Sequence, residues 1–172
     1  MSTSQPKSGP NGQPTPPSKA LDRTDWRILE ELQADARISY AELGRRVGLS
    51  SPAVQERVRK LEDAGIITGY QAVVNPRRVG YPILAIIRFS SPRDEQKLRR
   101  ELERTPYIID CYGVLGTDAY IAKVAAPDVE ELGRVADELQ SVAATTTAVV
   151  TLIVEENAPI TSNFGEVKPG RS

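Results

Sequence analysis

The sequence contains no histidine, and Cys111 is its only cysteine. Without imidazole, the serine, cysteine and zinc hydrolases lose their usual general base or metal ligand, which leaves carboxylates and lysines for acid–base catalysis. A lone cysteine excludes an intramolecular disulfide and argues against a zinc site built from cysteines. Neither of the phosphate-binding patterns GxxxxGK(S/T) and GxGxxG occurs. These absences argue against the common enzyme classes, and the sequence predicts no metal and no cofactor.

Long apolar stretches are also missing. The longest uninterrupted apolar run, Ile83–Ile87, has five residues, whereas a transmembrane helix needs roughly 18 or more. The first twenty residues lack an apolar segment that could form the core of a signal peptide. With 40% apolar residues, 26% charged residues and a net charge of −1, the composition is typical of a soluble globular protein. We therefore expect no membrane association and a cytoplasmic location.

The first twenty residues differ from the rest in composition. They contain five prolines, two glycines and four serines, and almost no residue that could enter a core. This composition predicts a disordered tail. Lys7 and Lys19 are its only charged side chains, so both a plain extension and a weak electrostatic contact with a polyanion are compatible with it.

Three helices are predicted between residues 21 and 65. Asp22 is suited to cap the first helix. Ser39 and Glu42 have the spacing of a capping box at the start of the second. Ser51 followed by Pro52 predicts the N-cap and the first turn of the third. The apolar positions that recur at helical spacing, and that we expect to be buried, are Ile28, Leu29, Leu32, Leu43, Val47, Val54, Val58 and Leu61.

The second and third helices are joined by Gly48–Ser50, a short turn that contains glycine. Two short helices joined by such a turn, with another helix bracing them, are typical of the helix-turn-helix motif. This arrangement would place the outer face of the third helix where it can enter a groove of DNA.

Beyond Gly69 the pattern changes to that of extended structure. Residues 70–74 are predicted to form a short strand, followed by a turn and a linker that reaches Pro82. The rest of the chain predicts strand 83–90, helix 92–104, strand 107–115, strand 118–125, helix 128–140 and strand 147–154. Ser91 and Asp128 are the expected N-caps, and Cys111 is expected to be a small buried residue. The order βαββαβ is that of a ferredoxin-like fold, with both helices on one face of an antiparallel sheet.

Two of these strands are apolar on both faces. The segments are Ile83–Ile87 and Val149–Val154. Because two helices cover only one face of the sheet, the other face must be buried elsewhere. Pairing with the same face of a second copy is the simplest solution, so we expect a homodimer.

Positive charge is concentrated in one segment. Between residues 45 and 60, five basic residues stand against one acid, Glu56, which gives a local balance of +4. The basic residues are Arg45, Arg46, Arg57, Arg59 and Lys60. A solvated helix face balanced by neighbouring acids is the plain alternative, but the position of the segment in a helix-turn-helix pattern favours a phosphate-facing surface. Double-stranded promoter or operator DNA is the expected partner.

The outer face of the third helix supplies candidate base-reading groups. Gln55 can bond adenine in a bidentate manner, Arg59 can bond guanine, and Glu56 can accept a hydrogen bond from cytosine. Arg57 and Lys60 lie nearer the edge and are expected to contact phosphates. The candidate DNA-binding residues are Ser39 and Tyr40, where free helix amides can donate to a phosphate, together with Ser50, Ser51, Ala53, Gln55, Glu56, Arg57, Arg59 and Lys60. Helix capping alone is the alternative role for Ser39.

Several sequence segments in the first half of the chain match a pattern known from one protein family. They are Leu21-Asp22, the segment ARISYAEL at residues 36–43, the segment VGLS at residues 47–50, and Gly65-Ile66-Ile67 before Gly69-Tyr70. These runs closely resemble the DNA-binding half of the Lrp/AsnC family of bacterial transcriptional regulators. The second half resembles the amino-acid-sensing RAM domain of the same family, and the resemblance spans about residues 21–156.

The resemblance implies an α+β fold in which an N-terminal helix-turn-helix domain, winged-helix-like, is joined to a C-terminal ferredoxin-like βαββαβ RAM domain. The expected division is a disordered tail (1–20), a helix-turn-helix domain (21–68), a linker strand (69–82), a RAM effector and oligomerisation domain (83–156) and a C-terminal tail (157–172). The resemblance also implies homodimers that assemble into tetramers or octamers. It further implies an amino-acid-like effector bound between RAM domains, near the loop after the second RAM strand.

In this sequence that loop spans residues 115–120. A turn that contains glycine and has free amides can hold a carboxylate, and Asp118 can pair with an ammonium group; an ordinary hairpin is the alternative. Two positions depart from the family, because Ala119 stands where many members carry an acid and residues 142–144 lack a common glycine. The candidate effector-binding residues are Gly116, Thr117, Asp118, Ala119, Tyr120, Thr145, Thr146 and Thr147.

Taken together, the residues and the resemblance predict a sequence-specific DNA-binding regulator of the Lrp/AsnC type, not an enzyme, located in the cytoplasm and associated with the bacterial nucleoid. Two alternatives stay open. The first is an architectural protein that coats DNA without an effector. The second is an enzyme related to the sirohaem decarboxylases, which resemble this architecture but depend on histidine near the tetrapyrrole.

Overall fold

The structure, a computed structural model, describes residues 20–163 and divides the chain into two compact units. The helical unit contains residues 20–72 together with residues 157–163, and the sheet unit is Val73–Glu156. The predicted disordered tail lies outside the described residues except for Ala20. The predicted C-terminal tail, residues 157–172, is likewise described only as far as Asn163.

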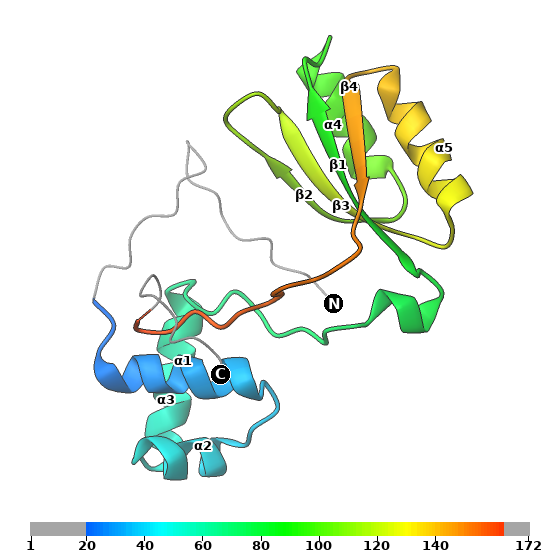
Figure 1. The fold of residues 1–172 in the computed structure, drawn as a ribbon. Coiled ribbons are helices and arrows are strands. Elements are labelled where there is room, and N and C mark those ends of the chain that lie inside the picture. Colours follow the sequence, from blue (N-terminus) through cyan, green and yellow to red (C-terminus); the bar gives the residue numbers. More distant parts are fainter. Residues whose placement is uncertain (1–19, 164–172) are drawn as a thin grey trace. The chain divides into compact units, whose positions relative to one another are not determined.

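The helical unit is built from α1 (Arg23–Ala34), α2 (Tyr40–Val47) and α3 (Ser51–Asp63) (Figure 1). These bounds confirm the three predicted helices. Its core consists of one or more buried apolar residues from each helix, namely Ile28, Leu43, Val47, Val54, Val58 and Leu61. Leu29 and Leu32 are partly buried against this core. The helical spacing of the apolar residues therefore predicted which face of each helix packs inward.

The helix caps differ in part from the expected pattern. At α1, Asp22 and Asp25 form a complete capping box, with Asp22 Oδ1 accepting from the amide of Asp25 at 2.8 Å. At α2, Ser39 Oγ accepts from the amide of Glu42 at 3.2 Å, but the Glu42 carboxylate bonds arginines instead of returning to Ser39. The predicted reciprocal box at α2 is therefore only half formed.

The start of α3 corrects a second prediction. Ser50 is the N-cap, Ser51 is the first helical residue, and Pro52 follows it within the first turn. The Ser50 side chain makes no capping hydrogen bond. Proline still occupies a position in the first turn where its missing N–H would have no helical partner. The reason for expecting proline near the helix start is therefore correct, although the helix begins one residue earlier than predicted.

The sheet unit contains β1 (Ile83–Ser90), α4 (Glu95–Arg104), β2 (Ile108–Gly113), β3 (Tyr120–Ala126), α5 (Val129–Gln140) and β4 (Ala144–Val149). The four strands form one antiparallel sheet in the order β2-β3-β1-β4, and both helices cover the same face (Figure 1). The predicted βαββαβ order and ferredoxin-like architecture are confirmed. A short 3₁₀ helix, η1 (Pro76–Val79), occupies the predicted turn before β1.

Strand register decides which side chains enter the core. Ala85, Ile87 and Phe89 of β1 are fully buried against the helices, and Leu98 of α4 and Val135 of α5 pack onto them. Because side chains alternate along a strand, Leu84, Ile86 and Arg88 point to the opposite face, which we call the open face.

Two strand predictions and one helix start are wrong. Residues 70–74 form no strand, since an extended segment needs a neighbouring strand to complete a ladder. β4 spans Ala144–Val149 instead of residues 147–154. Its ladder ends where the amide of Val150 donates to Leu84 O at 2.8 Å, and β1 begins only one residue earlier, after Pro82. At α4, Asp94 is the N-cap in place of Ser91 and bonds the amide of Lys97 at 2.9 Å.

Cys111 is also placed differently from the prediction. It lies in β2, which is an edge strand, and it is exposed. Within the part of the chain that the structure describes, no strand pairs with the outer edge of β2, so Cys111 is only partly shielded by the residues around it. Within residues 20–163, no helix is long and apolar enough to cross a membrane.

Candidate DNA interface and effector site

The outer face of α3 is exposed along its length. Val54 and Val58 on the inner face are fully buried, whereas Gln55, Glu56 and Arg59 are exposed. Lys60 is exposed as well, and Ala53 is half-buried. The structure thus holds the predicted base-reading side chains on the solvent side of a helix whose other side is anchored in a core.

The turn between α2 and α3 depends on a glycine that the sequence pattern did not single out. Gly44 is buried within α2, and its carbonyl accepts a hydrogen bond from the amide of Leu49 at 2.9 Å. A Cβ atom added at Gly44 would lie 2.5 Å from the carbonyl oxygen of Leu49. Gly48 ends α2 with a φ of 78°, a left-handed conformation that favours glycine. These two glycines set the close approach of α3 to α2.

Polar side chains that make no hydrogen bond within their helix lie at the start of α2 and α3. Tyr40 is 38% exposed at the first residue of α2. Ser50 and Ser51 make no side-chain hydrogen bond within the described residues. Free hydroxyls and amides at a helix N-terminus are suited to bind a phosphate oxygen, so these positions fit the predicted backbone contacts. Ser39 differs because its hydroxyl is occupied as the cap of α2.

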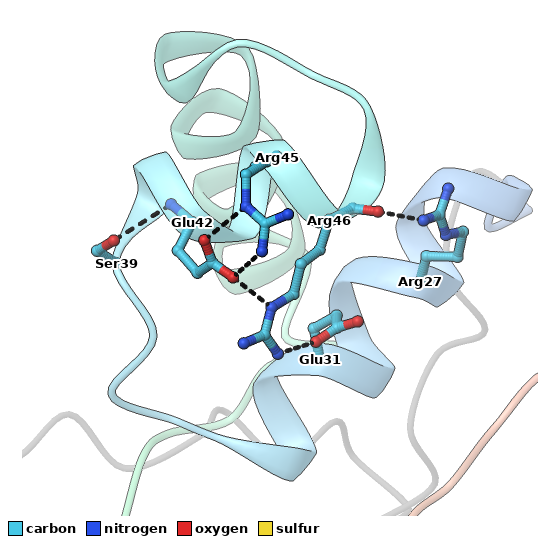
Figure 2. Close-up of polar contacts among 6 residues, drawn as sticks. All are labelled: Arg27, Glu31, Ser39, Glu42, Arg45 and Arg46. Atoms are coloured by element: carbon cyan, nitrogen blue, oxygen red, sulfur yellow. Dashed lines mark hydrogen bonds and ion pairs between the residues drawn. The ribbon is translucent and has the colours of Figure 1, made fainter.

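The two arginines of α2 belong to a network of charged side chains (Figure 2). The carboxylate of Glu42 accepts from Arg45 Nη2 at 2.7 Å and from Arg46 Nε at 2.8 Å. Arg46 also bonds Glu31 of α1 at 2.8 Å, and Arg27 of α1 donates to the carbonyl of Arg46. The hydrogen bonds from Arg45 and then Arg46 lower the pKa of Glu42 to about 2, so this carboxylate stays ionised in all but strongly acidic solution. The network joins α1 to the end of α2.

The cations on the outer face of α3 are paired with acids on the same helix. Glu56 accepts from Arg59 Nη2 at 3.0 Å and lies 3.5 Å from Lys60 Nζ, and the Arg59 hydrogen bond is the main cause of the lowered pKa of Glu56. Arg59 also lies 3.5 Å from Asp63. All of these side chains are well exposed, and exposed pairs of this kind contribute little to stability. They can therefore exchange a carboxylate for a base or a phosphate at small cost.

Arg57 differs from its neighbours because its guanidinium faces α1. Arg57 Nη1 donates to Asp22 Oδ2 and to Asp25 Oδ1, each at 2.7 Å. The Asp25 side chain is only 17% exposed. These bonds raise the pKa of Arg57, with the Asp22 bond as the largest cause. Arg57 thus ties the capping box of α1 to the middle of α3, and this position does not fit the phosphate contact expected from the sequence.

We predict that Arg57→Met lowers the melting temperature of the helical unit by a few degrees, because a partly buried Asp25 loses its partner. Methionine keeps much of the length and apolar packing of the arginine stem. The slope of log affinity for DNA against log salt concentration should stay unchanged, since no phosphate contact is lost. Circular dichroism melts and salt titrations measure the two quantities. If the slope of log affinity against log salt concentration fell by about one unit, Arg57 would be shown to contact a phosphate.

An ion pair joins the predicted effector loop to β1. Asp118 Oδ2 accepts from Nε of Arg88 in β1 at 2.8 Å. The Asp118 side chain is 15% exposed and that of Arg88 is 51% exposed. The loop closes with the amide of Ala119 donating to the carbonyl of Phe89 at 2.7 Å, and Gly116 adopts a φ of 144°. Arg88, which sequence reasoning missed, is the one charged residue of β1.

The register separates the predicted effector residues into two groups. Thr146 lies opposite Arg88 in the β1–β4 ladder, so its side chain shares the open face with Arg88 and Asp118. Thr145 and Thr147 lie opposite Phe89 and Ile87, which point toward the helices. Tyr120 also lies opposite Phe89 and packs against the core. Gly116 and Thr117 are exposed in the turn. The structure thus brings together only Asp118 and Thr146 of the predicted set and adds Arg88.

Within the described residues, no group of three or more His, Cys, Asp or Glu side chains is placed to hold a metal ion.

Comparisons with known proteins agree with the architecture of both units. Residues 21–62 match the family model of the AsnC-type helix-turn-helix domain, and residues 84–160 match that of the Lrp/AsnC ligand binding domain. A proline dehydrogenase transcriptional activator of Rhodobacter capsulatus is 36% identical over 148 residues, which cover 81% of this chain and 96% of the relative.

Solved structures show the same fold. The structure of LrpC of B. subtilis superposes with a TM-score of 0.76 at 33% identity, covering 80% of this chain and 99% of that one. A feast or famine regulatory protein from M. tuberculosis, complexed with L-methionine, has a TM-score of 0.76 at 30% identity and covers 83% of this chain and 99% of its own. The chain belongs to the Lrp/AsnC family of DNA-binding transcriptional regulators.

Proposed function

We propose that the helical unit reads an operator by placing the outer face of α3 in the major groove. In this proposal Gln55, Glu56 and Arg59 face base edges, with Ala53 in apolar contact. The observation that supports it is the exposure of these side chains on a helix whose opposite face is fully buried. An α-helix fits the major groove, where each base pair presents its own donors and acceptors.

The phosphate contacts come from the edges of the same surface. Lys60 is exposed on α3, and Ser50, Ser51 and Tyr40 lie at the start of the two helices that meet at the turn. Ser39 supports these contacts by capping α2. Arg57 acts as a positioning residue that holds α3 on α1, so the proposal assigns it no contact with DNA.

The minimum assembly in this proposal is a homodimer, with tetramers or octamers as larger forms. The open face of the sheet carries half-buried Ile86 and Ile121 and a Tyr112 side chain that is 59% exposed. Apolar faces of this kind are normally covered in the working assembly. A two-fold dimer reads two half-sites separated by whole helical turns of DNA, so the operator is expected to be approximately palindromic.

The effector in this proposal is an α-amino acid bound beside Arg88 and Asp118. An amino acid carries an ammonium and a carboxylate, and these can replace the two partners of the ion pair that joins Arg88 to Asp118. Thr146 adds a hydroxyl on the same face. A solved relative complexed with L-methionine supports this ligand class. The regulator would act in the bacterial cytoplasm, at the nucleoid.

Footprinting on genomic fragments tests the DNA part of the proposal. Protection confined to defined, approximately palindromic sites is the expected result. Uniform coverage of the fragments would instead favour the architectural alternative, in which the protein coats DNA. Titrations at several salt concentrations complement the footprints, because each phosphate contact adds about one unit to the salt slope.

The effector part predicts that an L-amino acid raises the melting temperature of the sheet unit, and that Asp118→Asn abolishes the increase. A ligand that binds only the folded state stabilises it by about 2.7 kcal/mol at a hundred times its Kd. Thermal melts with each of the twenty amino acids, starting with L-methionine, measure the effect. Asp137→Asn, which changes an exposed acid on α5, is the control and should keep the increase. An absence of any shift with the unmodified protein would remove the effector from the proposal and leave the DNA part intact.

A further inference from the structure

The chain returns to the helical unit after leaving the sheet. β4 ends at Val149 in the sheet unit, and residues 157–163 belong to the helical unit. Figure 1 shows this segment, in red, running beside α1. The chain therefore passes between the two units twice, once at residues 72–73 and once at residues 156–157.

One side chain of α1 holds the returning segment by both of its polar atoms. Gln33 Nε2 donates to the carbonyl of Ile160, and Gln33 Oε1 accepts from the amide of the same residue, each at 2.8 Å. The side-chain amide thus bonds one residue of an extended chain as a neighbouring strand would. The pairing depends on the backbone of residue 160 rather than on its side chain, and the two partners are 127 positions apart in the sequence.

An apolar groove lies beside this pair. It has a volume of about 520 Å³, and its lining includes Trp26 and Leu29 of α1, Ile66, Ile67 and Tyr70 of the segment after α3, and Ile160. Ile160 itself is 55% exposed, so little apolar surface is buried when the segment docks. Hydrogen bonds that are open to water contribute modestly to stability, which indicates that the segment is held loosely enough to leave.

We propose that this face of α1 is a docking site for an extended peptide, and that residues 158–162 of the same chain are its occupant, forming a reversible clasp. The clasp joins the chain that follows β4 to the first helix of the helical unit. With the clasp closed, the helical unit is restrained at both of its connections to the sheet unit. With the clasp open, it is restrained only at residues 72–73.

The single tryptophan of the chain reports on the clasp directly, because Trp26 lines the groove that Ile160 borders. Gln33→Leu removes both hydrogen bonds while keeping a good helix former at an exposed position of α1. Ile160→Pro removes the amide that donates to Gln33 without altering α1. Both variants should shift the Trp26 emission maximum to longer wavelength. Gln96→Leu, at an exposed position of α4, is the matched control and should leave the emission unchanged.

Hydrogen exchange on the full chain gives a second measure. The Ile160 amide should exchange at least tenfold more slowly than in an unstructured peptide, and Gln33→Leu should return it to the unstructured rate. If the slow exchange of the Ile160 amide disappeared when the protein was diluted, residues 158–162 would be docking on another copy of the chain instead of on their own. Exchange at the unstructured rate in the unmodified protein, or an emission maximum that neither variant moves, would overturn the clasp.

A third consequence rests on the proposed function. A helical unit restrained at two points is better placed to bind both half-sites of an operator at once. Gln33→Leu should therefore weaken binding to a two-half-site operator several-fold and leave binding to a single half-site unchanged. A chain that binds no operator at all would refute the proposed function. The fluorescence and exchange results would still show whether the clasp forms.

Discussion

Gly44→Ala should destabilise the helical unit, although alanine is the better helix former. The added Cβ would lie 2.5 Å from the carbonyl oxygen of Leu49, and that oxygen belongs to the backbone of the turn that leads into α3. Neither side can move without separating α2 from α3, whose apolar residues share one core. Overpacking of this kind costs typically about 1–3 kcal/mol, which exceeds the gain of roughly 1 kcal/mol from replacing glycine in a helix.

Urea unfolding followed by circular dichroism measures this loss, and Gly133→Ala is the matched control. Gly133 lies within α5, and a Cβ added there meets nothing within 4 Å. The control should therefore stabilise the sheet unit by about 0.5–1 kcal/mol. If Gly44→Ala proved as stable as the unmodified chain, the close approach at the turn would not be a constraint. The contrast between two helical glycines isolates the effect of the contact from that of helix propensity.

Gln55→Ala should lower the affinity for the operator by about 1–3 kcal/mol, the usual value of a bidentate base contact. This corresponds to roughly a fivefold to 150-fold change in Kd. Gln55 is exposed in the middle of α3, and within residues 20–163 its amide has no hydrogen-bond partner, so nothing must be broken before it meets a base. Because no phosphate contact is removed, affinity for unrelated DNA and the salt slope should both stay constant.

Electrophoretic titrations against the footprinted operator and an unrelated duplex provide the measurement. Gln140→Ala, at an exposed position at the end of α5, is the control and should bind both duplexes as the unmodified chain does. An equal loss on both duplexes would show that Gln55 contributes no sequence discrimination. A loss confined to the operator would identify α3 as the base-reading helix.

The parts of the structure that were predicted from the sequence depend on local periodicity. The spacing of Val54, Val58 and Leu61 indicated the buried face of α3, and the apolar run from Ile83 indicated β1 with its observed bounds. Hydrophobic periodicity is the strongest local signal of secondary structure. The orientation of the exposed α3 side chains followed from the same pattern.

The parts that were missed depend on partners that are distant in the sequence. Arg57 meets Asp22 across 35 positions, and Arg88 meets Asp118 across 30. Nothing in the local sequence around either arginine indicates which acid it faces, and only the packed fold shows it. Gly44 was missed for the same reason, since its constraint comes from a carbonyl in the following turn. The segment after β4 was predicted as strand because it is apolar, but its ladder partner on β1 ends first.

The discontinuity of the helical unit also fixes the order in which it can be completed during synthesis. Its three helices leave the ribosome first, whereas the segment that docks on α1 follows only after residues 73–156 have been made. At a translation rate of roughly 5–20 residues per second, this interval lasts on the order of ten seconds. A nascent chain therefore carries α1 and its Trp26 groove for this interval before residues 158–162, the proposed occupant of the groove, have been made.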